Sequence, residues 1–321
     1  MKRLALKLLA AATLTALGHA ALAADYPDKP VRLVVPTAAG GSLDTLARLL
    51  GQRLEAALGQ PFVVENRAGA NGNTAFEYVA RAKPDGYTLL VASDALAINP
   101  SLYKNVRYDP MKSFAPVALV TTAAQVLVVK PSLGVKDIKS FTALAREKGK
   151  ALSIGSPGSG SAGHLSAVLY QSETHTAWTH VAYKGGGPAV ADVVGGHIDG
   201  LFVTLAPAVP QVKAGKLVAI AVTTPKRSSA LPDVPSVAES LPGFDVTNWQ
   251  GVFAPAGTAA DRVARINATI QKIAAEPEIR AKLNDLGFET ATGAPAELGQ
   301  HVQENFSKWA RIIPQANITV D

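Results

Sequence analysis

The sequence predicts an α/β fold with two lobes, each a mostly parallel sheet flanked by helices, joined by two hinge crossovers. Short apolar runs of strand type alternate with amphipathic helical segments along most of the chain, which is typical of βα units. Hydrophobic residues make up 48% of the sequence and charged residues 17%, so the chain can build a substantial core. Two irregular, proline-containing passages at 119–137 and 225–245 divide the pattern, and we expect the chain to pass between the lobes there.

The first 23 residues have the pattern of a secretory signal peptide. Three basic residues precede a long apolar run, which ends in the small-x-small sequence Ala-Leu-Ala at 21–23. A transmembrane anchor would need about 20 apolar residues without this small-residue exit. We therefore expect residues 1–23 to be cleaved and the mature protein to be soluble and exported.

The charge and the missing cysteines exclude several classes of protein. The formal net charge is +6, and the leader carries three of these positive charges, which leaves the mature chain near +3. Acidic and basic residues are interspersed, without the basic stripe that nucleic-acid binding needs, so we expect no nucleic-acid partner. Because the chain has no cysteine, it has no disulfide framework, no cysteine-ligated zinc and no cysteine nucleophile.

The expected elements follow in chain order. Apolar runs predict strands at 31–35, 62–65, 87–92, 125–129, 152–155, 178–183, 198–203, 217–222 and 246–254. Helical spacing predicts helices at 43–58, 75–82, 138–148, 164–171, 188–195, 208–215, 259–275, 277–286 and 295–314. The two crossovers assign residues 24–122 and 250–321 to lobe 1 and residues 123–249 to lobe 2.

A strand end, a glycine-containing turn and a helix start follow one another at 36–44. Glycine lets main-chain N–H groups approach a ligand, and the first turn of a helix leaves further N–H groups without partners. Together with the helix dipole, they can hold an anion. The alternative is an ordinary tight turn in which Ser42 or Asp44 caps the helix. The candidate residues of this loop are Thr37, Ala38, Ala39, Gly40, Gly41, Ser42 and Asp44, with Asp44 as its expected brace.

Residues 152–171 repeat this arrangement, with a short strand, a glycine- and serine-rich loop and a helix start. Glycines at 158, 160 and 163 also fit G-x-G-x-x-G, the dinucleotide-binding fingerprint. That function needs an acidic residue at the end of the next strand, which here ends in Tyr-Lys-Gly instead, so we expect no nicotinamide, flavin or other cofactor. The candidate residues of this second loop are Ser156, Gly158, Ser159, Gly160 and His164.

Neither loop offers catalytic machinery. The nucleophile elbow G-x-S-x-G does not occur around the serines of the second loop, and His164 at a helix start is expected to cap or pack. The six histidines include no H-E-x-x-H pair, so we expect no metal site. Two anion-binding loops without a nucleophile and base describe a receptor better than an enzyme, and we expect no enzymatic activity.

Longer motifs carry a family resemblance. VVENRAGANG, PDGYTLL, SPGSGSAGHL, AYKGGGPAV and WQGVFAPAGT occur in this order along the chain. In these motifs the sequence resembles the extracytoplasmic solute receptors of tripartite tricarboxylate transporters, the Bug receptors, over nearly the whole mature chain. The resemblance implies a periplasmic binding protein of the two-lobe, type II-like architecture. It further implies a monomer that closes by hinge motion around a small carboxylate, held largely by main-chain N–H groups and bridging waters.

The resemblance also implies delivery of the carboxylate to the membrane permease subunits of a tripartite tricarboxylate-type transporter. A ligand-sensing subunit of a signalling system is an alternative, as is, less in keeping with these residues, an exported hydrolase on the same scaffold. Thr37 stands where such receptors usually carry an aromatic residue, which should enlarge or polarise one wall of the site. Carried onto this sequence, the resemblance adds as ligand contacts Ser93, Asp94, Ala95, Lys184, Gly185 and Phe202.

Overall fold

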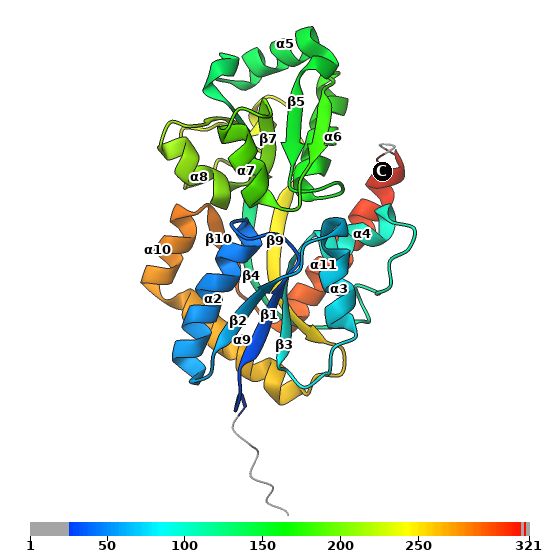
Figure 1. The fold of residues 1–321 in the computed structure, drawn as a ribbon, viewed down its shortest axis with the longest axis vertical. Coiled ribbons are helices and arrows are strands. Elements are labelled where there is room, and N and C mark those ends of the chain that lie inside the picture. The colour runs from blue at the N-terminus through cyan, green and yellow to red at the C-terminus, as the bar shows by residue number, and fades with distance from the viewer. Residues whose placement is uncertain (1–25, 316–317, 319–321) are drawn as a thin grey trace, which may run out of the picture.

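The computed structural model describes residues 26–315 and residue 318, and the signal peptide expected at 1–23 lies outside them. Figure 1 shows two lobes, each built on a sheet with helices on its faces, which confirms the predicted two-lobe α/β fold. The sheets are mixed rather than mostly parallel, because the two strands that pass between the lobes run antiparallel to their neighbours. Within the described part of the chain, no helix is long and apolar enough to cross a membrane.

Lobe 1 has the strand order β2-β1-β3-β9-β4, with β10 also paired to β4. The first three strands in the chain are parallel, so their carboxyl ends all point toward lobe 2 (Figure 1). The strands are β1 Val31–Val35, β2 Phe62–Asn66, β3 Thr88–Ser93, β4 Phe114–Val129, β9 Thr247–Pro255 and β10 Phe288–Thr290. The helices are α2 Ser42–Leu58, α3 Asn73–Ala80, α4 Ala95–Leu102, α9 Ala260–Ala275, α10 Pro277–Asp285 and α11 Pro295–Gln315.

Lobe 2 uses the second half of β4, which pairs with both β7 and β8. The sheet continues from β7 to β5 and β6, and these three strands are parallel to one another. The strands are β5 Ser153–Ser156, β6 Thr179–Ala182, β7 Gly200–Thr204 and β8 Val218–Val222. The helices are α5 Ile138–Lys148, α6 Ala162–Thr174, α7 Gly186–Val194 and α8 Leu205–Lys213.

One strand, β4, belongs to both sheets. Its residues up to Ala124 pair with β9 in lobe 1, and from Gln125 onward they pair with β7 and β8 in lobe 2. The second crossover runs beside the first, since Thr247 at the start of β9 is paired with Ala124. The sequence predicted only residues 125–129 of this strand, because the threonines and alanines at 121–124 weaken the apolar run before it. Gln125 therefore stands where the chain leaves one sheet and enters the other.

The C-terminal helix α11 makes a further contact between the lobes. It packs along α4 and β4 of lobe 1. Near its end, Trp309 and Ile313 are buried in the same hydrophobic cluster as Leu127 and Val246, which lead into and out of lobe 2. The end of the segment assigned to lobe 1 thus lies against both lobes.

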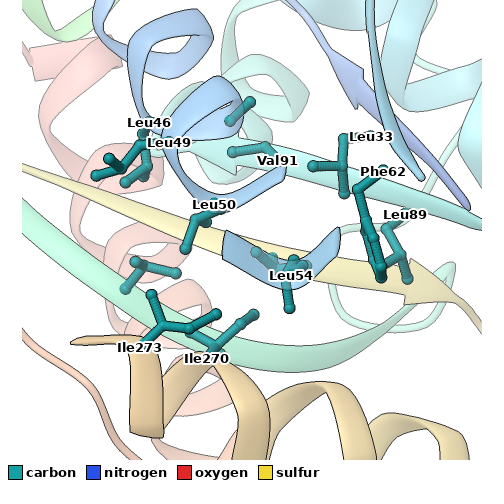
Figure 2. Close-up of a cluster of buried hydrophobic side chains, with 14 of the residues drawn as sticks. Leu33, Leu46, Leu49, Leu50, Leu54, Phe62, Leu89, Val91, Ile270 and Ile273 are labelled. Carbon is teal, nitrogen blue, oxygen red and sulfur yellow. The ribbon is translucent and has the colours of Figure 1, made fainter. Parts of the chain in front are cut away.

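Helix α2 is fixed by leucines along one face. Leu46, Leu50 and Leu54 recur at helical spacing and are at most 2% exposed. They pack with Leu33 of β1 and Ile270 of α9 in one core cluster, shown in Figure 2. This packing holds α2 so that its N-terminal end lies at the edge of the sheet that faces lobe 2 (Figure 1).

We predict that Leu54→Ala lowers the free energy of unfolding by about 2–5 kcal/mol, because it removes buried methyl groups and leaves a cavity under α2. Urea denaturation followed by circular dichroism measures this. Val63→Ala is the control, since that side chain is 51% exposed and its truncation should change stability by less than about 0.5 kcal/mol. Equal losses in the two variants would contradict the role assigned to this core.

Candidate ligand-binding site

A small cavity of about 60 Å³ lies between the two lobes. Lobe 1 lines it with residues 36–37, 41–43, 71 and 93–95, and lobe 2 with residues 157, 161–163, 186 and 204. Gln125 and Asn248 of the crossover strands close it between them. The carboxyl ends of the parallel strands of both lobes meet here, which is where open α/β sheets bind their ligands.

A larger groove of about 1090 Å³ lies on the outside of lobe 1, around α3. Two of its cations are engaged with aromatic neighbours, since Arg32 lies over the Tyr78 ring and Lys29 over the Tyr87 ring. Among the described residues that line this groove, no buried side-chain atom lacks a hydrogen-bond partner. The smaller cavity is the stronger candidate because it does contain such atoms.

On the lobe 1 side, the first turn of α2 faces the cavity. Gly40 turns the chain into the helix with a φ of +80°, which glycine adopts without strain. Asp44 braces this turn, because its carboxylate accepts hydrogen bonds from the Gly40 N–H at 2.9 Å and from Arg48 Nε at 3.0 Å. Burial raises the pKa of Asp44, but these bonds outweigh burial and hold it below the usual value. The N–H groups of Ser42 and Leu43 at the cavity wall have no intrahelical partners.

On the lobe 2 side, the first turn of α6 faces the same cavity. Ser161 caps this helix, because its Oγ accepts a hydrogen bond from the His164 N–H at 3.3 Å. Ala162 and Gly163 follow it and line the cavity with main-chain N–H groups that lack intrahelical partners. A Cβ atom on Gly163 would overlap the carbonyl oxygen of Phe202, so glycine is needed for α6 to lie this close to β7.

Two polar side chains of the cavity wall have no hydrogen-bond partner within residues 26–315. Gln125 is 1% exposed, and both its amide oxygen and its amide nitrogen are unpaired. The hydroxyl of Thr37 is buried and unpaired as well. Leaving such a group unsatisfied costs about 1–3 kcal/mol. A ligand that offers these atoms an acceptor and a donor would recover that free energy.

Asp94 brings an ionisable group to the cavity wall. Its side chain is 2% exposed, and Asn248 Nδ2 donates a hydrogen bond to its carboxylate. Burial raises the pKa of Asp94 to about 7, against the opposing effect of hydrogen bonds from Ser93 and the local main chain. Near neutral pH this carboxyl group is therefore divided between its ionised and protonated forms.

His164 supports the second loop from behind. Its Nδ1 accepts a hydrogen bond from the Gly160 N–H at 3.0 Å, and its ring stacks on that of His180 with the centroids 4.1 Å apart. Burial, and to a smaller extent His180, lowers the pKa of His164 to about 4. The ring is therefore neutral at neutral pH, which is the state in which Nδ1 can accept this bond.

The two lobes are in contact with each other around the cavity. The Ala38 N–H donates to the carbonyl oxygen of Lys184 at 2.9 Å, and the Tyr103 hydroxyl donates to that of Ser159 at 3.1 Å. Gly187 of α7 lies so close to lobe 1 that a Cβ atom there would overlap the carbonyl oxygen of Ala39. A ligand held between these contacts would be shielded from water.

The residues predicted from the sequence fall into three groups. The cavity wall contains Thr37, Gly41, Ser42, Ser93, Asp94 and Ala95. The contact between the lobes contains Ala38, Ala39, Gly40, Ser159, Lys184 and Gly185. Off the wall lie Asp44, Ser156, Gly158, Gly160 and His164, which hold the two loops, and Phe202, whose ring stacks on Trp178. Direct contact between any of them and a ligand stays a prediction.

The sequence reasoning missed Gln125 and Asn248. Gln125 carried a signal, because a glutamine that opens the apolar run QVLVV enters the core with a polar group to satisfy. Asn248 carried none, since its place beside Asp94 depends on the pairing of β9 with β3 in the fold. The first turn of α6 was also missed, because the predicted helix began two residues too late, at His164.

Two catalytic arrangements can be tested against the structure, a metal site and a nucleophile with its base. Within the described ranges, no group of three or more His, Asp or Glu side chains gathers as a metal site. Ser156 Oγ lies 2.7 Å from His180 Nε2, which resembles a nucleophile and base. Ser156 is fully buried, however, and its hydroxyl donates to the carbonyl oxygen of Gly158 behind the second loop rather than lining the cavity.

Comparison with known proteins agrees with this geometry. The model of the tripartite tricarboxylate transporter family receptors matches residues 46–318. The chain belongs to this receptor family. The family resemblance inferred from the sequence motifs is thereby confirmed, and the family consists of solute-binding proteins rather than enzymes.

Three similar proteins of known structure superpose on nearly the whole chain. The periplasmic binding protein BugD is 33% identical, with 92% of this chain and 99% of BugD covered and a TM-score of 0.88. R. palustris Rpa4515, solved with adipate, is 34% identical, with 92% and 99% covered and a TM-score of 0.89. MatC (Rpa3494) from Rhodopseudomonas palustris, with bound malate, is 34% identical, with 90% and 100% covered and a TM-score of 0.84.

His164 makes the stability of the protein depend on pH. Because its pKa of about 4 in the folded protein lies below the ordinary value of 6.5, the unfolded chain binds this proton more readily. His164 therefore costs no stability above pH 6.5 and destabilises the fold progressively as the pH falls toward 4, by up to about 3 kcal/mol. We predict that His164→Asn, whose side-chain oxygen can still accept from the Gly160 N–H, loses less stability than the wild type over this range.

Urea unfolding at about pH 7.5, 6 and 4.5 measures the difference between variant and wild type. The difference is needed because the raised pKa of Asp94 acts in the opposite direction, destabilising the fold as the pH rises toward 7. His175→Asn, an exposed position with a left-handed φ that asparagine tolerates, should keep the wild-type pH dependence. A His164 variant with that same dependence would show that the buried ring is not the cause.

Proposed function

We propose that this protein is a periplasmic solute receptor that captures a small carboxylate by hinge closure and delivers it to the membrane subunits of a tripartite tricarboxylate-type transporter. The observation that carries the proposal is the cavity between the lobes, which the first turns of α2 and α6 and the unpaired amide of Gln125 all face. Main-chain N–H groups and the positive ends of two helix dipoles stabilise a carboxylate without any cationic side chain.

The energetics of such a site fit a receptor that must also release its ligand. A hydrogen bond to a charged group contributes about 1.5–3 kcal/mol. Three or four of them, less the cost of association, correspond to a dissociation constant of about micromolar. The adipate of Rpa4515 and the malate of MatC support this ligand class, since both are small dicarboxylates.

The family and the leader pattern both support a periplasmic location. Cleavage after residue 23 would release the receptor into the periplasm, in keeping with its similarity to the periplasmic binding protein BugD. The closed monomer would then present both lobes at once to the permease. An empty, open receptor would present a different surface, so the permease could distinguish the receptor with ligand from the empty one.

A thermal-shift screen of the mature protein tests the proposal. The panel contains dicarboxylates, tricarboxylates, aromatic acids and amino acids, with malate and adipate among them. We expect at least one acid to raise the melting temperature, because a ligand that binds only the folded state stabilises it by mass action. Uncharged amides of the same acids are the matched controls. No shift with any acid, or equal shifts with the amides, would overturn the carboxylate assignment.

We predict that Gln125→Leu raises the stability of the empty receptor and weakens binding of the acid found in the screen. Stability rises because an unpaired buried amide, which costs about 1–3 kcal/mol, is removed. Affinity falls about 10- to 150-fold, because a hydrogen bond to a charged group is lost. Calorimetry measures the affinity and urea unfolding the stability. Gln52→Leu, on the exposed face of α2, is the control and should change neither affinity nor stability. Unchanged affinity in Gln125→Leu together with weakened binding in Gln52→Leu would contradict the proposed site.

Hinge closure can be tested without touching the cavity wall. We predict that Gly187→Ala weakens ligand binding at least about fivefold, because its Cβ would overlap the Ala39 carbonyl oxygen across the interface and overpacking costs about 1–3 kcal/mol. Small-angle scattering should also show a larger radius of gyration with ligand than the loaded wild type has. Gly299→Ala, which meets only ordinary contacts in α11, is the control. Unchanged affinity and size would show that closure does not use this contact.

A further inference from the structure

The cavity between the lobes contains one ionisable group. Of the described residues that line it, only Asp94 can carry a charge. Its carboxyl group stands at the carboxyl end of β3, just before α4, and is 2% exposed. One of its oxygens accepts a hydrogen bond from Asn248, and the same wall contains the unpaired amide of Gln125. A carboxylate ligand in so small a space would share it with this side chain.

The elements packed around Asp94 do not supply a nearby cation that would stabilise two ionised carboxylates in the cavity. Helix α4 carries no charged residue, and β9 contributes the neutral Asn248. From α11, Lys308 has the weakest of the effects that act on the carboxyl group. From α2, Asp44 is turned into its own hydrogen bonds within the first loop, and from α6, His164 is neutral at neutral pH. Two ionised carboxylates in this cavity would therefore repel each other with little screening.

We infer that Asp94 is protonated when the carboxylate ligand is bound, so that loading of the receptor takes up one proton from solvent. This inference rests on the proposed function. In the loaded state the Asp94 hydroxyl donates a hydrogen bond to the ligand carboxylate, while its other oxygen keeps the bond from Asn248. Burial of Asp94 already favours this protonated form in this structure. Asp94 then selects for an acid with an acceptor oxygen at this wall.

The consequence is an affinity that depends on pH. Below pH 7 the buried carboxyl group is largely protonated in this structure even without a ligand, so the ligand itself adds little to the proton uptake there. Above pH 7 the group must gain a proton on loading, and the dissociation constant should rise up to about tenfold per pH unit. The receptor would thus hold its acid more tightly on the acidic side of neutrality.

Titration calorimetry of the mature receptor tests this between about pH 6.5 and 9, where malate and adipate are fully ionised. The probes are these two acids and the tightest-binding acid of the screen. At each pH, buffers of different ionisation enthalpy give the number of protons taken up. The wild type should take up close to one proton at about pH 8.5 and markedly less at about pH 6.5.

Asp94→Asn keeps an oxygen for Asn248 to donate to, and it should show no proton uptake and an affinity independent of pH. Asp261→Asn, at an exposed position in α9, should behave as the wild type does. An infrared band of a protonated carboxyl group should also appear in the wild type on loading at high pH. This readout and the proton count need only the wild type, so they hold even if the Asp94 variant fails to fold.

The outcomes separate this inference from the function on which it rests. If an acid binds and the wild type takes up no proton at high pH, or the uptake persists in Asp94→Asn, the inference is wrong and the carboxylate receptor stands. If no acid of the panel binds at any pH, the proposed function and the inference fall together. Proton uptake that is present in the wild type and in Asp261→Asn but absent in Asp94→Asn establishes the inference.

Discussion

The buried amide of Gln125, which lacks a hydrogen-bond partner at the crossover between the lobes, is the constraint on which the other features depend. Gln125 is buried where β4 passes from one sheet to the other, and neither end of its amide is paired within the described residues. Closing the lobes over such a group costs free energy unless something inside pairs with it. A ligand that supplies the missing partner stabilises the closed state selectively, and this differential binding is what shifts a hinge equilibrium.

The scaffold places the remaining cavity-facing groups around that amide. The leucine row of α2 holds this helix against the lobe 1 sheet, and Gly163 lets α6 lie close to β7 in lobe 2, so both first turns face the same small space. The two crossover strands run side by side, with Gln125 at the point where β4 leaves one sheet and enters the other. The groups that face the cavity therefore come from both lobes.

The sequence carried the local part of this arrangement, since glycine turns and helix starts depend on neighbouring residues. It predicted the two loops, the two-lobe α/β fold and the family. It did not reveal the mixed sheets, because the direction of β9 and β10 depends on pairing with distant strands. It also left Asn248 unrecognised, and it did not reveal that the ring of Phe202 packs against Trp178 and Tyr170 in the core, off the cavity wall. These positions depend on burial and on contacts between distant residues, such as Asn248 and Asp94, which lie 154 residues apart. A local sequence pattern contains no information on such contacts.

A crystal structure of the receptor loaded with an acid from the screen tests the central claim most directly. The account predicts that the oxygens of one ligand carboxylate lie within about 3.2 Å of main-chain N–H groups from both first turns, those of α2 and α6, and that Gln125 is hydrogen-bonded to the ligand or to a water that the ligand holds. An acid bound in the groove around α3, or one bound between the lobes with the Gln125 amide still unpaired, would contradict it.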